Sequence, residues 1–254
     1  FLGSSTGTLC VDDPGAVEAV FAHAPTLLAA HCEDDAIIAA NSARVRSRYG
    51  DAVPMTEHPA IRSTDACLQS SARAVALARR HDTRLHILHL STAAELDLLS
   101  DRPLEEKRIT AEVCVHHIHF DDSQYRQLGT RMKCNPAIKT AADRRALVQA
   151  ICDGRIDVIG TDHAPHTIAE KQRPYFQAPS GLPLVQQALV CLLEHYHEAR
   201  LSLTQIVEKA CHAPARLFDV QERGYLREGY WADLVLVDLK RPAVVDEATL
   251  LYRC

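Results

Sequence analysis

The chain has no long apolar run, no surplus of positive charge and no closely spaced pair of cysteines. A membrane-spanning helix requires about 20 consecutive apolar residues, and no stretch of the 254-residue sequence approaches that length. Lysine and arginine total 28 against 33 aspartates and glutamates, which gives a net charge of −5 and a pI near 6.3. This balance provides no electrostatic basis for binding nucleic acid or an acidic membrane surface.

The nine cysteines are odd in number, scattered, and never spaced as Cys-x-x-Cys. Disulfide frameworks of secreted proteins instead combine an even number of cysteines with short, regular spacings. We therefore expect reduced thiols and a cytoplasmic protein. Hydrophobic residues make up 47% of the chain, which is enough to bury a sizeable core.

The most informative stretch runs from Gly160 to Lys171, because it places a carboxylate and two imidazoles just after a strand. Residues 156–159 (Ile-Asp-Val-Ile) are mostly apolar and β-branched, which predicts a strand. Asp162 then stands at the carboxyl end of that strand, where α/β barrels carry their chemistry. Taken alone, Asp162 has two interpretations: a metal ligand and proton acceptor, or a hydrogen-bonded residue that caps a helix.

Two other strand-like segments end on histidine. The apolar run at 26–30 leads into His31 and then turns acidic, and residues 84–92 contain His86 and His89. Because successive side chains of a strand alternate between its faces, only one of this pair can face a barrel interior. We expect it to be His89, which is nearer the carboxyl end and precedes Ser-Thr, a typical helix start. His86 is then packed or exposed.

Two strand-end imidazoles and one strand-end carboxylate are ligands that zinc accepts, and a catalytic zinc keeps one position open for water. His31, His89 and Asp162 are far apart in sequence. They must therefore converge through the fold rather than along one helix.

The string Gly-Thr-Asp-His-Ala-Pro-His at 160–166, followed by Lys171, resembles the signature of dihydroorotases within the cyclic amidohydrolases. The resemblance implies reversible closure of N-carbamoyl-L-aspartate to dihydroorotate, a small-molecule substrate, and a homodimer. It also implies two zinc ions per chain. In that family the two histidines bind one metal, and the aspartate binds the other while it accepts the proton of a bridging water. These roles carry onto His31, His89 and Asp162.

Part of the family's metal site has no counterpart in this sequence. The His-x-His of the first strand, the arginine after it and the bridging carboxylated lysine (aspartate in some relatives) would all lie upstream. Residues 1–7 (Phe-Leu-Gly-Ser-Ser-Thr-Gly) look like the segment just after that bridging residue. We therefore expect the chain to begin partway through the protein.

Further positions resemble the substrate-binding residues of the family. Lys133-Cys134-Asn135-Pro136 is similar to a loop that grips substrate, which gives Asn135 that role, although Asn-Pro is also an ordinary turn starter. His166 matches the residue that binds the substrate carboxylate. The turn containing Ser180 and Gly181 resembles a backbone contact site, but the Ala178-Pro179 before it departs from the commoner Phe-Gly.

His117-Ile118-His119 has the His-x-His spacing of a zinc site, but its context favours another interpretation. It follows a predicted strand that lies between the His89 and Asp162 units. The segment resembles the Glu-x-x-x-His-His element of dihydroorotases. We expect Glu112, His116 and His117 to support the site or pack beside it rather than bind metal.

Predicted strands alternate with predicted helices over most of the chain, which indicates βα units of a parallel sheet. The strands are expected near 26–31, 85–90, 109–115 and 156–160, and the helices near 34–48, 65–81, 93–100, 141–153 and 183–199. The predicted fold is α/β: a TIM-type (β/α)8 barrel whose second half is residues 1–218. Residues 224–238 combine a turn, alternation and a β-branched strand. With them, residues 219–254 resemble the return to a small β-sandwich domain, and a simple hairpin is the alternative.

Two rival functions remain open at this point. A hydantoinase or allantoinase would share His31, His89 and Asp162, but those families usually replace the Ala-Pro-His that ends in Pro165-His166. A non-catalytic dihydroorotase-like subunit that scaffolds aspartate transcarbamoylase is the other rival. Such relatives tend to lose metal ligands.

Overall fold

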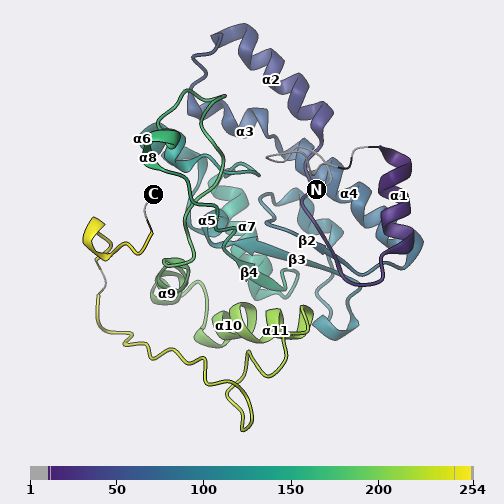
Figure 1. Ribbon diagram of the computed structural model, residues 1–254, viewed down its shortest axis with the longest axis vertical. Helices are drawn as coiled ribbons and strands as arrows, with labels where there is room; N and C mark the ends of the chain where they lie inside the picture. Colours follow the sequence, from purple (N-terminus) through teal and green to yellow (C-terminus); the bar gives the residue numbers. More distant parts are fainter. Residues whose placement is uncertain (1–10, 12, 243, 253–254) are drawn as a thin grey trace.

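The computed structural model describes residue 11, residues 13–242 and residues 244–252 (Figure 1). Residues 1–7, for which we expect a position just after a bridging ligand, lie outside this part. Among the described residues, no helix is long and apolar enough to cross a membrane.

Four parallel strands form one sheet in the order of the chain. They are β1 (Leu28–Ala30), β2 (Leu85–Ile87), β3 (Ile109–Cys114) and β4 (Val158–Gly160). Each neighbouring pair is parallel, as successive right-handed βα units require. All four predicted strands are therefore present, and three of them are shorter than the apolar runs that predict them.

The long helices follow the expected positions closely where a side chain caps their start. Asp34 accepts a hydrogen bond from the backbone of Ile37 at the start of α2 (Asp35–Tyr49), and Ser63 caps α4 (Thr64–His81). Thr140 and Asp143 form a capping box at the start of α7 (Ala141–Cys152). These caps satisfy backbone donors that have no partner inside a helix.

Two expected helices are shorter than the sequence predicts. The region 93–100 forms only the 3₁₀ segment η2 (Ala94–Leu98), in which buried Glu95 accepts hydrogen bonds from Ser71 and Thr92. Residues 185–187 form a turn, so α9 covers only Ala188–His197. Local hydrogen bonds of this kind compete with regular helix.

The remaining elements are short except for α1. They are α1 (Pro14–His23), η1 (Met55–Glu57), α3 (His58–Ile61), η3 (Leu104–Glu106), α5 (Val115–His119), η4 (Asp122–Gln124), α6 (Tyr125–Leu128), η5 (Gly129–Met132), α8 (Ile168–Lys171), α10 (Leu203–Val207), the π-helical η6 (Glu208–His212), α11 (Ala213–Leu217) and η7 (Glu247–Thr249).

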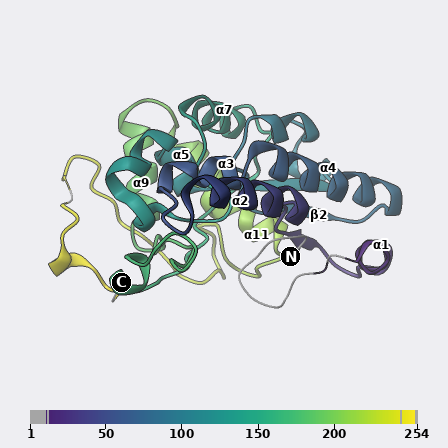
Figure 2. The same ribbon diagram turned by 90° about the horizontal axis from the view of Figure 1, so that it is seen from above.

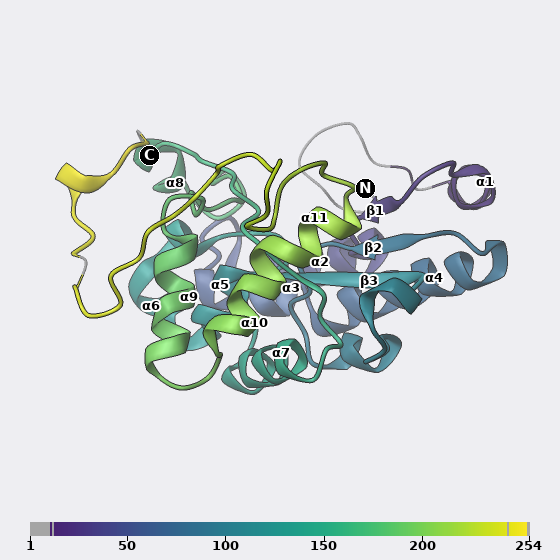
Figure 3. The same ribbon diagram turned by 90° about the horizontal axis from the view of Figure 1, so that it is seen from below.

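The two faces of the sheet carry different residues. Leu85, Ile87 and Val113 lie in the main hydrophobic core with residues of α4 and α7. His86 and Glu112 occupy the alternate positions and lie on the other face. Helices α2 and α3 lie on one side of the strands, while α10 and α11 lie on the other (Figure 1); seen from below, α10 and α11 pass in front of the strands (Figure 3). The ring of Phe218, just after α11, contacts that of His86 at a centroid distance of 5.3 Å.

The chain after α11 forms no strand in the described residues up to 252. Seen from above, it loops away from the packed helices (Figure 2). Leu226, Leu234 and Val235 are exposed, and Leu236 is 101% exposed. The strand expected around 224–238 is therefore absent here, because a strand needs neighbours for its backbone N–H and C=O groups and the described chain places none beside it. The domain boundary at 218/219 and the small sandwich stay predictions.

Candidate active site at the carboxyl ends of the strands

Two of the predicted metal ligands lie against each other at the carboxyl ends of β1 and β2. The Nδ1 atom of His31 is 2.9 Å from the Nε2 atom of His89. Their rings meet edge to face with centroids 4.7 Å apart, and both side chains are buried. The structure therefore brings together two imidazoles that are 58 residues apart in the sequence.

A buried carboxylate and guanidinium hold His31 from its other side. Glu33 Oε2 lies 3.3 Å from His31 Nε2 and also pairs with the guanidinium of Arg62. Burial alone would raise the pKa of the Glu33 carboxyl, but the charges of Arg62 and His31 outweigh burial and lower that pKa to about 2. The ionised carboxylate favours a proton on His31 Nε2, which leaves the Nδ1 lone pair toward His89.

The sequence signal for this arrangement was incomplete. The acidic turn after His31 contains Glu33, but nothing in the sequence links it to Arg62. The role of Glu33 therefore became visible only in the structure.

Asp162 stands two residues beyond the end of β4, at the same edge of the sheet. Asp162 is exposed to solvent. Partial burial of its carboxyl nevertheless raises the pKa of that group, and the charge of Glu112 raises it further, while His31 lowers it. Asp162 and His89 both have left-handed backbone, with φ of 45° and 37°. Such conformations are costly for residues other than glycine and cluster at functional sites.

Two of the four predicted substrate residues line a cavity of about 490 Å³, whereas His166 and Gly181 are not among its lining residues. Asn135 and Ser180 line it together with Arg62 and Lys133. Among the described residues, the buried Oδ1 atom of Asn135 has no hydrogen-bond partner. Because Arg62 also pairs with Glu33, this cavity is connected to the histidine pair through two side chains.

The loop that carries Ser180 and Gly181 is fixed by its neighbours. His166 Nε2 lies 3.1 Å from the carbonyl oxygen of Ser180. Gly181 has a φ of 144°, and a Cβ atom there would lie 2.6 Å from the Ala164 carbonyl oxygen. The Lys171 ammonium donates to the carbonyls of Lys133, Pro179 and Gly181 at 2.8, 2.9 and 3.0 Å. Lys171, the lysine of the signature, thus fixes the position of this loop.

A second group of potential ligands lies at the end of β3. Cys114, His116 and His117 are buried, and each offers a ligand atom within 4.8 Å of the others. In the described part of the chain, neither ring nitrogen of His116 has a hydrogen-bond partner, and burial lowers the pKa of His116 to about 3. His119, the second histidine of the His-x-His pattern, lies apart from this group and contacts the ring of Phe120.

The remaining histidine of the strands is structural. His86 is buried and its Nδ1 atom lies 2.9 Å from the hydroxyl of Thr110 on β3. Its Nε2 atom is 3.5 Å from Glu112. His86 is packed, which is one of the two outcomes expected for it.

The side chains at the ends of β1, β2 and β4 are donors of the types that zinc accepts, but among the described residues only Cys114, His116 and His117 lie close enough together to be grouped as a ligand set. Two imidazole nitrogens point at each other and a carboxylate lies at the same edge of the sheet, which is the ligand chemistry of catalytic zinc sites. Glu33 provides the outer carboxylate that usually accompanies a zinc-binding histidine.

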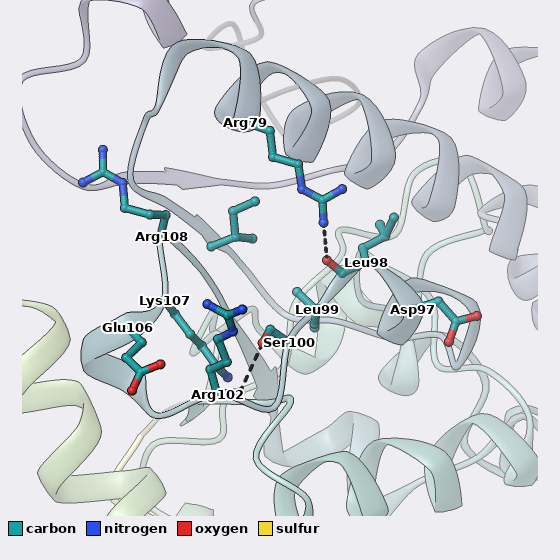
Figure 4. A pocket seen from close by; sticks show the side chains of 10 residues that line it. Arg79, Asp97, Leu98, Leu99, Ser100, Arg102, Glu106, Lys107 and Arg108 are labelled. Atoms are coloured by element: carbon teal, nitrogen blue, oxygen red, sulfur yellow. Dashed lines mark hydrogen bonds between the residues drawn. The ribbon is translucent and has the colours of Figure 1, made fainter.

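Another cavity, of about 450 Å³, lies near the amino end of β3 and is lined by Arg79, Arg102, Lys107 and Arg108 (Figure 4). Its basic groups are engaged by the protein. Arg79 donates to the carbonyl oxygen of Leu98, and Lys107 pairs with Asp157 at 2.7 Å. In parallel α/β sheets the chemistry lies at the opposite, carboxyl ends of the strands. We therefore do not assign the site to this cavity.

Comparison with known proteins gives a consistent result. The amidohydrolase family model matches residues 40–251. The chain is 31% identical over 213 residues to the dihydroorotase of Methanosphaera stadtmanae, covering 84% of this chain and 49% of that protein. It is 35% identical over 230 residues to the dihydroorotase of Lactiplantibacillus plantarum, covering 89% and 52%. The chain thus spans about half the length of the curated relatives it matches.

The structural comparison supports the same fold. The L-hydantoinase of Arthrobacter aurescens superposes with a TM-score of 0.81 at 23% identity, covering 91% of this chain and 52% of that chain. At that level of identity the likeness concerns the fold alone. It confirms the predicted α/β class: the chain forms part of a TIM-type barrel.

Proposed function

Because the chain belongs to the amidohydrolase family, we propose that the protein is a dihydroorotase, which interconverts dihydroorotate and N-carbamoyl-L-aspartate. The observation that carries this proposal is the convergence of His31 Nδ1 and His89 Nε2 at 2.9 Å, with Asp162 at the same edge of the sheet. The identity of 31–35% to two dihydroorotases supports the choice of substrate.

We propose that the site holds zinc, two ions per chain, with His31, His89 and Asp162 as ligands. A carboxylated lysine or an aspartate upstream of this sequence would bridge the two ions. When bound, zinc lowers the pKa of a water and polarises a carbonyl oxygen. Glu33 and Arg62 keep His31 oriented for this purpose.

Asp162 is the proposed acid–base residue. In the hydrolytic direction, water oxygen adds to the ring amide carbon, the carbon–nitrogen bond breaks, and one proton must reach the leaving nitrogen. The Asp162 carboxylate would accept that proton from the water and return it to the nitrogen. Without metal, burial and the charge of Glu112 raise the pKa of this carboxyl, and bound cations would lower it.

Asn135 and His166 are the proposed ligands of the substrate carboxylate. Asn135 lines the 490 Å³ cavity beside Arg62, whose positive charge favours an anionic substrate there. Ser180 and Gly181 would offer backbone groups from the loop that Lys171 fixes.

Neither rival function is favoured. The hydantoinase neighbours share the fold at 23% identity, which gives no information on substrate. A non-catalytic scaffold subunit would be free to lose its ligands, whereas His31, His89 and Asp162 are all present.

Cellular location and assembly are proposals as well. We propose a cytoplasmic homodimer that acts on small molecules and binds neither nucleic acid nor membrane. The described cysteines are free, which supports a reducing compartment. The family resemblance supports the dimer.

The test is turnover of dihydroorotate by the complete protein, with hydantoin as the matched control, since hydantoin has the cyclic amide but no carboxylate. Metal content is measured on the same sample by plasma mass spectrometry. We expect dihydroorotate hydrolysis and about two zinc ions per chain. Turnover of hydantoin alone would indicate a hydantoinase, and no activity or metal after addition of zinc and bicarbonate would indicate the scaffold.

A further inference from the structure

The group formed by Cys114, His116 and His117 is not used by the proposed reaction. Cys114 is the last residue of β3, and the two histidines lie in α5, which begins at once. All three side chains are at most 3% exposed, and their ligand atoms lie within 4.8 Å of one another. The group is local in sequence, so it does not depend on long-range loop positions.

Each of the two histidines has at least one ring nitrogen that no hydrogen bond of the described residues engages. His117 Nε2 is 3.1 Å from the carbonyl oxygen of Pro136. A carbonyl can only accept, so the ring proton is on Nε2 and the lone pair is on Nδ1. Within the described residues, that Nδ1 atom has no hydrogen-bond partner, and neither nitrogen of His116 has one. Buried polar atoms are normally satisfied.

We propose that Cys114, His116 and His117 form an additional metal site that binds zinc or a similar borderline ion. One thiolate and two imidazoles are donors that zinc accepts, and three protein ligands leave a fourth position for water. Pro136 plays the part of the outer carbonyl that fixes the tautomer of a zinc-binding histidine. Binding displaces the thiol proton of Cys114 to solvent, since a coordinating thiol is deprotonated.

The charged groups around this position act in both directions, since Lys139 places a positive charge near His117. The carboxylates of Glu112 and Asp162 act on Cys114, and both would be attracted to a bound ion. The site is distinct in chemistry from the one at His31 and His89, because only the proposed additional site contains a thiolate.

That difference provides the experiment. The complete protein, stripped of metal, is titrated with Co²⁺ while the near-ultraviolet absorption from thiolate-to-cobalt charge transfer is recorded. We expect this band in the wild-type protein and its loss in Cys114→Ser, with one fewer cobalt ion bound per chain. Cys134→Ser is the matched control: Cys134 is a buried neighbour that also contacts the Pro136 carbonyl, and this variant should keep the band.

X-ray absorption at the zinc edge tests the same site without any substitution. The zinc-loaded wild-type protein should show a sulfur scatterer at about 2.3 Å. A wild-type protein with no charge-transfer band and no zinc–sulfur scattering would overturn the proposal. A band of equal strength in Cys114→Ser would also overturn it, because the thiolate would then come from another cysteine.

Discussion

The two groups of histidines at the carboxyl ends of the strands differ in the ion pairs that the protein places around them. At the ends of β1 and β2, His31 faces His89 on one side and Glu33 on the other, and Arg62 holds Glu33 in turn. At the end of β3, the described structure provides no partner for either nitrogen of His116.

This contrast indicates two ways of preparing a buried polar site. A buried polar atom without a partner costs about 1–3 kcal/mol. At the ends of β1 and β2, the ion pairs of Glu33 with His31 and Arg62 orient His31 in advance, although His89 Nδ1 and Glu33 Oε1 also have no hydrogen-bond partner among the described residues. At the end of β3, the free-energy cost of the unpartnered nitrogens remains until a ligand binds. Removing a side chain at the ends of β1 and β2 should therefore lower stability or activity. Removing one at the end of β3 should change the stability of the metal-free protein little.

The largest effect is expected at Asp162, whose carboxylate interacts electrostatically with both His31 and Cys114. Asp162→Asn keeps the size of the side chain but cannot accept a proton. We expect kcat for dihydroorotate to fall by about 10²- to 10⁴-fold, with little change in the unfolding midpoint. Asp101→Asn, in an exposed turn, is the control. Near-full activity of Asp162→Asn would remove its acid–base role.

The Glu33→Ala variant tests whether the ion pairs around His31 stabilise the protein. The substitution removes the buried carboxylate that pairs with both Arg62 and His31, which should lower the free energy of unfolding by about 3–5 kcal/mol. Urea denaturation followed by circular dichroism measures this. Glu18→Ala is the matched control, because Glu18 pairs with Arg80 at the surface and exposed pairs contribute only about 0–1 kcal/mol. Equal effects of the two variants would contradict the assigned role of Glu33.

His58 allows the comparison to be extended to pH. Its Nδ1 atom is 2.8 Å from the Tyr175 hydroxyl and its Nε2 atom 2.7 Å from the Cys134 carbonyl oxygen, which suits the neutral ring. Burial lowers the pKa of His58 to about 3, whereas an unfolded histidine titrates near 6.5. Between these values the unfolded state binds more protons, so stability should fall as the pH decreases.

The contribution of His58 is about 1.4 kcal/mol per pH unit within that range. Urea midpoints measured from pH 7 to pH 4 should show a shallower decline for His58→Gln than for the wild-type protein. Identical pH profiles would show that His58 does not need to stay neutral in the folded state.

The smallest effect is expected at His116. In metal-free protein, His116→Phe removes two unpartnered nitrogens and keeps most of the volume, so the free energy of unfolding should change by less than about 1 kcal/mol. Denaturation in the presence of a chelator provides the measurement. A loss of several kcal/mol would show that His116, like His31, makes stabilising contacts in the metal-free protein.

The sequence was sufficient for features that depend on local patterns. The short apolar runs located the strands to within a few residues. Alternation did not decide between the two histidines, because His86 lies on the face of Glu112 and His89 meets His31 from a left-handed backbone beyond the strand. Asp34 and Ser63 marked the starts of α2 and α4 because capping is a local interaction. Parallel strands then bring His31, His89 and Asp162 to one edge, which is why their convergence could be expected.

Features that depend on distant contacts were not predictable. The pair Glu33–Arg62 joins residues 29 positions apart, and neither residue belongs to a recognisable spacing. The shared cavity of Asn135 and Ser180 depends on how Lys171 holds the loop. The segment around 224–238 shows the converse case: its β-pattern is clear in the sequence, but a strand forms only beside another strand.

The exposed run after α11 has a practical consequence for handling the protein. The side chains of residues 234–236 (Leu-Val-Leu) are exposed. They lie in an extended stretch of chain, and exposed apolar segments of this kind nucleate β-pairing between molecules. Light scattering by a solution of this chain should therefore increase steeply with concentration. Replacing Leu236 by lysine should keep such solutions clear, since a charged side chain opposes stacking of like chains.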